Sequence, residues 1–136
     1  MKCITSQDSS EGAALEQWSC NSSREQQFWV GQGPGGSLAL HARNGQRCID
    51  IAGMGVGNGT KAQLWSCGYW LRSQLFSPIR TSMATSSQGY YELQAGHVSK
   101  CLDCSGLPNS DDGANLQLWS CSGQANQAFL LPGIVL

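Results

Sequence analysis

Apolar residues along the chain come in short runs, and no window of about 12 residues keeps the 3.6-residue spacing of a helix without an interrupting Gly, Ser or Asn. Turn dipeptides bound these runs at Asn44-Gly45, Asn58-Gly59 and Asp112-Gly113. The runs span residues 38–40, 62–65, 90–93, 116–119 and 129–131. Short apolar runs separated by turns predict an all-β chain.

One segment, a glycine followed by Trp-Ser-Cys, recurs at a period of about 50 residues. Each copy has another cysteine upstream and a Gln-x-aromatic motif downstream. The copies end at Cys20, Cys67 and Cys121, and their downstream motifs are Gln27-Phe28-Trp29, Gln74-Leu75-Phe76 and Gln127-Ala128-Phe129. We therefore divide a single domain into a first unit (residues 1–36), a second unit (37–88) and a third unit (89–136). Repetition of short strands favours a closed barrel, which has no exposed sheet edge.

The first unit is shorter at its start than the other two. A strand-like segment precedes the first cysteine of the second unit (37–42) and of the third unit (90–95), whereas only Met1 and Lys2 precede Cys3. The chain also ends in an apolar stretch, 132–136, that the third unit does not require. We expect this C-terminal stretch to fill the strand position missing beside the N-terminus.

The charge of the chain is low and nearly balanced. Of its 136 residues, 12% are charged, and the formal net charge is −1. Nucleic-acid binding and attraction to anionic membranes both need a basic surface, which this composition does not supply. No apolar run approaches the roughly 18 to 20 residues needed to span a bilayer. We expect no nucleic-acid partner and no membrane insertion.

Six of the seven cysteines occupy matching positions in the three units. They fit one disulfide in each unit: Cys3 with Cys20, Cys48 with Cys67, and Cys101 with Cys121. Such bridges form in oxidising compartments, so we expect a secreted or extracellular protein. The first cysteine follows Met1 and Lys2 with no leader, which indicates either a removed leader or a module of a longer secreted chain.

Cys104 is the cysteine left over, and with Cys101 it forms a C-x-x-C motif. This motif could indicate redox chemistry or half of a zinc site. No second C-x-x-C or histidine pair completes a metal-ligand set. We therefore expect no bound metal and favour a small buried thiol.

The motifs Cys-x-Asp, Gln-Leu-Trp-x-Cys and Asn-Gln-x-aromatic together resemble the ricin-type lectin domain, which also occurs as a carbohydrate-binding module of secreted glycosidases. The resemblance covers essentially the whole chain. It implies a β-trefoil, with three four-stranded units around a pseudo-three-fold axis and shallow sugar sites on the outside. It also implies that Trp29, Phe76 and Phe129 form the hydrophobic centre.

A sugar site needs a carboxylate that accepts from two hydroxyls, an aromatic face for the C–H patch, and amides. By resemblance, the third unit supplies all three with Asp103, Trp119, Asn126 and Gln127, and has Gln117 and the loop 109–113 at its rim. We call this set the third-unit site.

The second-unit site keeps Asp50, Gln63, Trp65 and Gln74 but has Ser73 in place of the asparagine. The loss of one amide contact weakens a site by about 1 kcal/mol without abolishing it. The first unit has Thr5 in place of the aspartate and Glu16 in place of the glutamine, so we expect it not to bind sugar.

The sequence offers little for catalysis. Asp50 and Asp103 belong to different units, too far apart for the carboxyl pair of a glycosidase, and His41 and His97 have no repeated nucleophile beside them. We expect a non-catalytic glycan-binding domain without a cofactor. The resemblance implies galactose or N-acetylgalactosamine as ligand. It leaves xylan-type and other glycans open, because the contacts that select the sugar lie in loops such as 52–57 and 105–112. An attached enzyme or toxin domain is consistent with the resemblance. A trefoil scaffold that acts through protein–protein contacts is the alternative.

Overall fold

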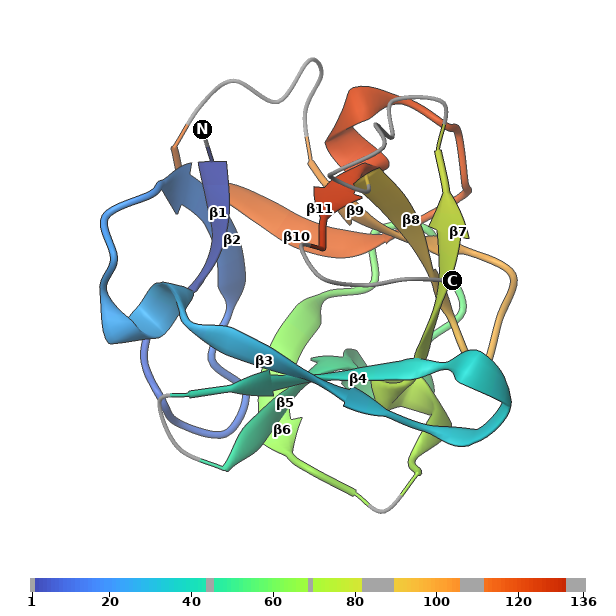
Figure 1. Cartoon of the computed structure of the whole chain (residues 1–136), viewed down its shortest axis with the longest axis horizontal. Coiled ribbons are helices and arrows are strands. Elements are labelled where there is room, and N and C mark those ends of the chain that lie inside the picture. Colours follow the sequence, from blue (N-terminus) through green and yellow to red (C-terminus); the bar gives the residue numbers. More distant parts are fainter. Residues whose placement is uncertain (1, 44–45, 69, 82–89, 106–111, 132–136) are drawn as a thin grey trace.

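The computed structural model describes residues 2–43, 46–68, 70–81, 90–105 and 112–131, and these residues form an 11-stranded antiparallel sheet (Figure 1). The described residues contain no α-helix; single turns of 3-10 helix connect some of the strands. The strands are β1 (Lys2–Ser6), β2 (Leu15–Ser19), β3 (Phe28–Gln32), β4 (Leu38–Ala42), β5 (Arg47–Ile51), β6 (Ala62–Ser66), β7 (Phe76–Arg80), β8 (Tyr90–Ala95), β9 (Cys101–Cys104), β10 (Ala114–Trp119) and β11 (Phe129–Leu130). The 3-10 turns are η1 (Arg24–Gln26), η2 (Pro34–Gly36), η3 (Ala52–Met54), η4 (Arg72–Gln74) and η5 (Ala125–Gln127). Among the described residues no helix has the length and apolar character needed to cross a bilayer.

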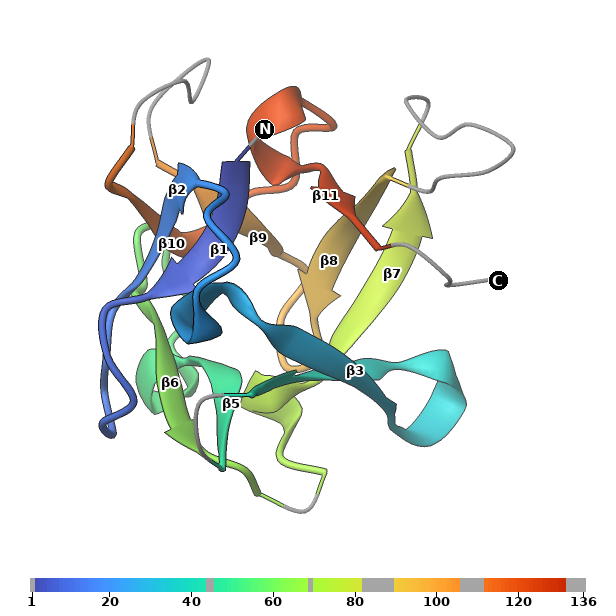
Figure 2. The ribbon, with the colours of Figure 1, turned by 60° about the vertical axis from the view of Figure 1, so that its left-hand side comes forward.

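Each unit contributes one hairpin in which a cysteine strand pairs with a Trp-Ser-Cys strand. The three hairpins are β1–β2, β5–β6 and β9–β10, and the pairing of β10 with β2 joins two of them. The strands that start at the Gln-x-aromatic motifs pair with the segment that opens the next unit, β3 with β4 and β7 with β8. In Figure 2, β2, β6 and β10 gather on the left, while β3, β7 and β11 lie on the right. This arrangement agrees with the trefoil that the resemblance implies.

A single core fills the space between the hairpins and the outer strands. Alternate positions of β4 and β8 point inward, because successive side chains of a strand face opposite sides of the sheet. The core consists of aliphatic side chains from all three units with Phe76 at 0% exposure, and its fully enclosed members include Leu15, Ile49, Ile51, Leu64, Leu93, Leu102 and Leu118. Phe28 and Phe129 pack against it while partly buried.

The predicted gap beside the first cysteine strand is present among the described residues. No described strand precedes β1 in the way that β4 precedes β5, and a groove of about 730 Å³ lies there, lined mainly by apolar side chains that include Ile4, Phe28, Val30 and Phe129. The segment expected to fill this position, residues 132–136, lies outside the described residues. Its placement therefore stays a prediction.

The three units interlock through the residues around the turn glycines. The side chain just before each glycine accepts a hydrogen bond from the amide of the serine in a neighbouring Trp-Ser-Cys segment. These pairs are Glu11 with Ser66, Asn58 with Ser120 (2.9 Å), and Asp112 with Ser19 (2.7 Å). We call this set the inter-unit ring.

The glycines of the ring have a second role. Gly12, Gly59 and Gly113 have φ values of +83°, +91° and +91°, a region that side chains rarely adopt. A Cβ at these positions would lie 3.4–3.9 Å from Cζ3 of Trp65, Trp119 and Trp18, respectively. Each tryptophan is thus seated on a glycine of another unit.

The three predicted disulfides are all present, with Cα–Cα distances of 5.1–5.2 Å. Cys104 is free and buried, and burial beside Asp103 raises the pKa of its thiol to about 12. Because Cys101 is bonded to Cys121, the C-x-x-C pair is not a redox couple, and the buried-thiol interpretation is confirmed.

Candidate functional site

The residues of the second-unit site surround one hollow in the surface. Asp50 on β5 lies opposite Gln63 on β6 in the hairpin register. The hollow has a volume of about 340 Å³ and is lined by Asp50, Gly53, Met54, Gln63, Trp65, Leu71 and Ser73. Gly53 and Met54 belong to the loop 52–57 that the sequence indicated as selecting the sugar, whereas sequence reasoning missed Leu71, because its loop carries no repeated motif.

A buried glutamine positions the carboxylate of this site. Gln74 donates from Nε2 to Asp50 Oδ2 at 2.8 Å and to Ser66 O at 2.9 Å, and its Oε1 accepts from the Gly68 amide at 2.9 Å. Since Gln74 is 2% exposed and does not line the hollow, it acts on a ligand through Asp50.

Asp50 carries an energetic cost. Burial raises the pKa of Asp50 above its ordinary value, and hydrogen bonds from Gln74 and Ser73 oppose that rise without cancelling it. The carboxylate is therefore held in a place that disfavours its charge. A buried acceptor that is only partly compensated is well suited to receive hydroxyl donors from a ligand.

The third-unit site repeats this arrangement with more amide donors. Asp103 Oδ1 accepts from Gln117 at 3.1 Å, and Oδ2 accepts from Asn126 at 3.1 Å and from Gln127 at 2.8 Å. The carboxylate is thus held by side-chain amides, which fix its orientation. A carboxylate has about four lone-pair positions, so three amide bonds leave capacity for a hydroxyl.

Asn126 adds an unpaired acceptor next to Asp103. Its Nδ2 donates to Asp103 and to Cys104 O at 3.1 Å, while its Oδ1 is buried without a hydrogen-bond partner. Gln127, at 0% exposure, holds Asp103 and the main chain in the same way as Gln74 does in the second unit. Most of the predicted rim, loop 109–113, lies outside the described residues; only Asp112 and Gly113 are described.

The indoles of both sites are accessible. Trp65 and Trp119 are each 43% exposed. One end of each ring rests on the glycine of a neighbouring unit, so the ring is supported and still offers surface to solvent. A supported aromatic face beside a fixed carboxylate is the geometry that a pyranose requires.

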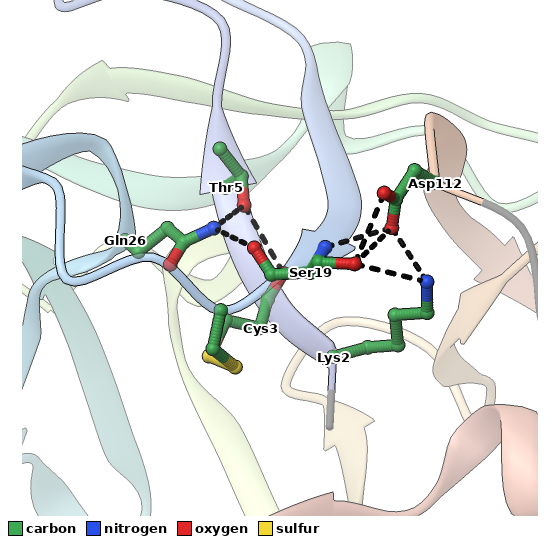
Figure 3. A network of polar contacts seen from close by, with 7 residues as sticks. Lys2, Cys3, Thr5, Ser19, Gln26 and Asp112 are labelled. Carbon is green, nitrogen blue, oxygen red and sulfur yellow. Dashed lines mark hydrogen bonds and ion pairs between the residues drawn. A yellow bond between two sulfur atoms is a disulfide. The ribbon is translucent and has the colours of Figure 1, made fainter.

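The first unit keeps the strand pairing of the site but lacks the aspartate carboxylate. Thr5 stands opposite Glu16 in the register, and its hydroxyl donates to Cys3 O at 3.1 Å and accepts from Gln26 Nε2 at 3.0 Å (Figure 3). The Thr5 hydroxyl therefore both donates and accepts a hydrogen bond within its own unit. That the first unit does not bind sugar stays a prediction.

Gln26, and not Gln27, is the first-unit counterpart of Gln74 and Gln127. Its Oε1 accepts from the Asn21 amide and its Nε2 donates to Ser19 O, as Gln74 and Gln127 do in their units. The motif that starts at Gln27 is therefore one residue out of register. The cysteine spacing does not decide the register, because Gln127 follows Cys121 by six residues and Gln74 follows Cys67 by seven.

The same shift changes the role of Trp29. The expectation that Trp29 belongs to the hydrophobic centre is wrong, because Trp29 is 47% exposed and Phe28 takes the inward position. The Trp29 ring stacks on His41 across β3 and β4, with ring centroids 3.7 Å apart. The absence of a side chain at Gly31 makes room for His41, since a Cβ there would lie 2.9 Å from Nε2.

The described residues bring together one group of potential metal ligands, His41 with Cys48 and Cys67. His41 Nδ1 lies 3.3 Å from Cys48 Sγ and 3.6 Å from Cys67 Sγ. Both sulfurs belong to a disulfide, so this group offers no thiolate ligand.

Comparisons with known proteins identify the family. A model of the ricin-type beta-trefoil lectin domain matches residues 37–133, and a model of the ricin-type beta-trefoil lectin domain-like family matches residues 2–65. No curated protein matches the chain.

Solved structures of the same fold cover nearly the whole chain. The designed three-fold symmetric protein ThreeFoil is 26% identical, with a TM-score of 0.85 over 96% of this chain and 90% of its own. A mosquitocidal holotoxin is 12% identical, with a TM-score of 0.82 over 98% of this chain, which spans only 16% of the toxin. A ricin B-like lectin of Macrolepiota procera in complex with lactose is 16% identical, with a TM-score of 0.68 over 93% of this chain and 90% of its own.

Three interlocked hairpin units, buried carboxylates beside supported indoles, and a family model that spans most of the sequence agree with one another: the chain belongs to the ricin-type beta-trefoil lectin domain family.

Proposed function

We propose that the chain is a non-catalytic domain that binds glycans at the second-unit and third-unit sites. The observation that carries this proposal is the repeated pairing of a buried, amide-held carboxylate with an exposed indole. Asp50 pairs with Trp65 in one unit, and Asp103 pairs with Trp119 in the other. The first unit has an equally exposed indole but Thr5 in place of the carboxylate, so its scaffold persists without the binding group.

Galactose or N-acetylgalactosamine is the ligand we favour. Two vicinal hydroxyls would donate to the carboxylate while the C–H face of the ring lies on the indole. The Macrolepiota procera lectin, which has the same fold, was solved with lactose, a galactoside. Shallow single sites of this kind bind monosaccharides near millimolar, or about −4 kcal/mol.

Two sites on one rigid body would favour ligands with many sugars. Simultaneous engagement raises avidity by about 100-fold or more when both sites can reach the same glycan surface. The three disulfides suit a secreted protein, and we infer an extracellular location. The toxin neighbour is far longer than this chain, so a catalytic or toxic domain attached to this one is part of the proposal.

A glycan array followed by calorimetry tests the proposal. We expect galactose-terminated glycans to bind the unmutated protein, Asp50→Ala and Asp103→Ala each to remove one site, and the double variant to remove binding. Asp8→Ala is a control, since Asp8 is an exposed acidic residue outside both sites that accepts hydrogen bonds from Ser10. Failure of the unmutated protein to bind any glycan would favour the protein-contact scaffold instead.

A further inference from the structure

Exposed large apolar side chains concentrate in the second unit, around the hollow that contains Asp50. The described residues include nine such side chains, and six belong to this unit: Met54, Val56, Trp65, Trp70, Leu71 and, on β7, Ile79. The 3-10 turn η3 carries Met54, and η4 begins directly after Leu71. These two turns lie against each other. Met54, Trp65 and Leu71 line the hollow together with Asp50, Gln63 and Ser73, so its wall has a polar part and an apolar part.

The other units have no large apolar pair at the position of Trp70-Leu71. Counted back from the equivalent glutamines Gln26, Gln74 and Gln127, the pair Trp70-Leu71 corresponds to Ser22-Ser23 in the first unit and to Gly123-Gln124 in the third. The large side chains are therefore not a requirement of the trefoil. They are specific to the second unit.

Backbone conformation supports the same conclusion. Ser22, Trp70 and Gly123 all have positive φ, at 63°, 55° and 71°, so the three units share one left-handed turn. A glycine fits this turn at no steric cost, whereas a bulky side chain is strained there. Among the described non-glycine residues only Ser22, Met54 and Trp70 have positive φ, and two of these three belong to the loops at the second-unit hollow. Strained residues that gather at one site point to function at that site.

We propose that the second-unit site takes glycosides with an apolar aglycone, an alkyl or aromatic group on the anomeric carbon. The sugar hydroxyls donate to Asp50 beside Trp65, and the aglycone lies on Met54 and Leu71. Trp70 precedes Leu71 in the chain. This assignment rests on the proposed function and adds the chemical class of ligand. An amphipathic ligand matches a wall that is polar on one side and apolar on the other.

Calorimetry with matched glycosides tests the inference in an Asp103→Asn background, which leaves the second-unit site. The probes are the methyl and 4-nitrophenyl β-glycosides of galactose, N-acetylgalactosamine and xylose, together with free 4-nitrophenol. We expect the 4-nitrophenyl form of the accepted sugar to bind at least about tenfold more tightly than the methyl form, because an aromatic ring buried on apolar side chains adds a gain of that size. Free 4-nitrophenol should not bind measurably.

Variants that take their residues from the other units separate the two parts of the site. Trp70→Gly and Leu71→Ser copy Gly123 and Ser23, and together they should reduce the preference for the aromatic aglycone over the methyl group to less than about twofold. Trp70→Gly should also raise Tm by about 3 °C, since glycine relieves the left-handed strain. A fall in Tm would show that Trp70 serves the fold and would contradict the inference.

The outcomes distinguish this inference from the function on which it rests. Equal affinity for methyl and 4-nitrophenyl glycosides, or a preference that survives in the double variant, overturns the inference and leaves sugar binding intact. Binding of free 4-nitrophenol as tightly as its glycosides also overturns it. Absence of binding for every glycoside, in this background and in the unmutated protein, refutes the proposed function itself.

Discussion

Replacement of Asp50 with asparagine should separate binding from stability. In the proposed complex Asp50 accepts from two sugar hydroxyls, and a charge-assisted hydrogen bond is about twice as strong as a neutral one. Loss of the charge therefore costs about 1 kcal/mol for each bond, or about 30-fold in affinity for two bonds. From a millimolar starting point, binding at the second-unit site would fall below detection.

The replacement of Asp50 with asparagine should not lower the stability of the folded state. Burial raises the pKa of Asp50, so the ionised carboxylate costs stability at neutral pH, and this cost disappears as the pH falls below the ordinary value of 3.8. The amide of an asparagine can still accept from Gln74 Nε2. We expect the Tm of Asp50→Asn to equal or exceed that of the unmutated protein at pH 7, and this difference to vanish near about pH 3.

Thermal unfolding across pH and titration with the accepted glycoside in the Asp103→Asn background measure both effects. An Asp50→Asn variant that loses several degrees of Tm yet keeps its affinity would refute the reasoning, because Asp50 would then be a structural residue. Asp8→Asn is a matched control, since hydrogen bonds from Ser10 lower the pKa of Asp8, and this exposed carboxylate lies outside both sites.

Four further predictions follow from the core, the free thiol, the acidic site and the gap. Phe28→Ala should lower the free energy of unfolding by more than Trp29→Ala in chemical denaturation, because Phe28 faces the core and Trp29 faces solvent. A larger loss for Trp29→Ala would contradict this and would make Trp29 the core residue of the motif. Cys104 should resist iodoacetamide in the native protein and react after unfolding, since its thiol is buried with a pKa of about 12; mass spectrometry measures the label. Glycoside binding at the second-unit site should weaken on acidification at a higher pH than an ordinary aspartate would give, because burial raises the pKa of Asp50; calorimetry at several pH values would contradict this if affinity held down to pH 3.8. Deletion of residues 133–136 should lower Tm if this segment fills the gap beside β1, and an unchanged Tm would contradict that placement.

The repeated motifs were sufficient to predict the all-β class, the three disulfides and the exposure of Trp65 and Trp119. Cysteine spacing and turn glycines carry this information, since both restrict the backbone whatever the surroundings. The Trp29 error arose because a Gln-x-aromatic pattern fits at two adjacent positions, and only the hydrogen bonds of Gln26 decide between them.

Other features could not be read from the sequence because they depend on contacts between units. Strand β7 contains Pro78 between polar and apolar residues, which is atypical of a strand, yet it pairs with β8 along its whole length. The apolar wall of the second-unit hollow joins Met54 and Leu71 from two separate loops. Comparison of the repeats shows where the units differ in sequence, and the structure shows which of these differing residues lie together.

The inter-unit ring sets the smallest piece of this chain that can be expected to fold. The serine amide of each unit is capped from another unit, and each indole rests on a foreign glycine, so a lone unit would lack both supports. A peptide of one unit should therefore be unfolded alone and acquire structure only as a closed trimer of identical chains. Duplication within one polypeptide replaces that concentration-dependent assembly with a covalent one, and frees one copy to lose its carboxylate while the others keep theirs.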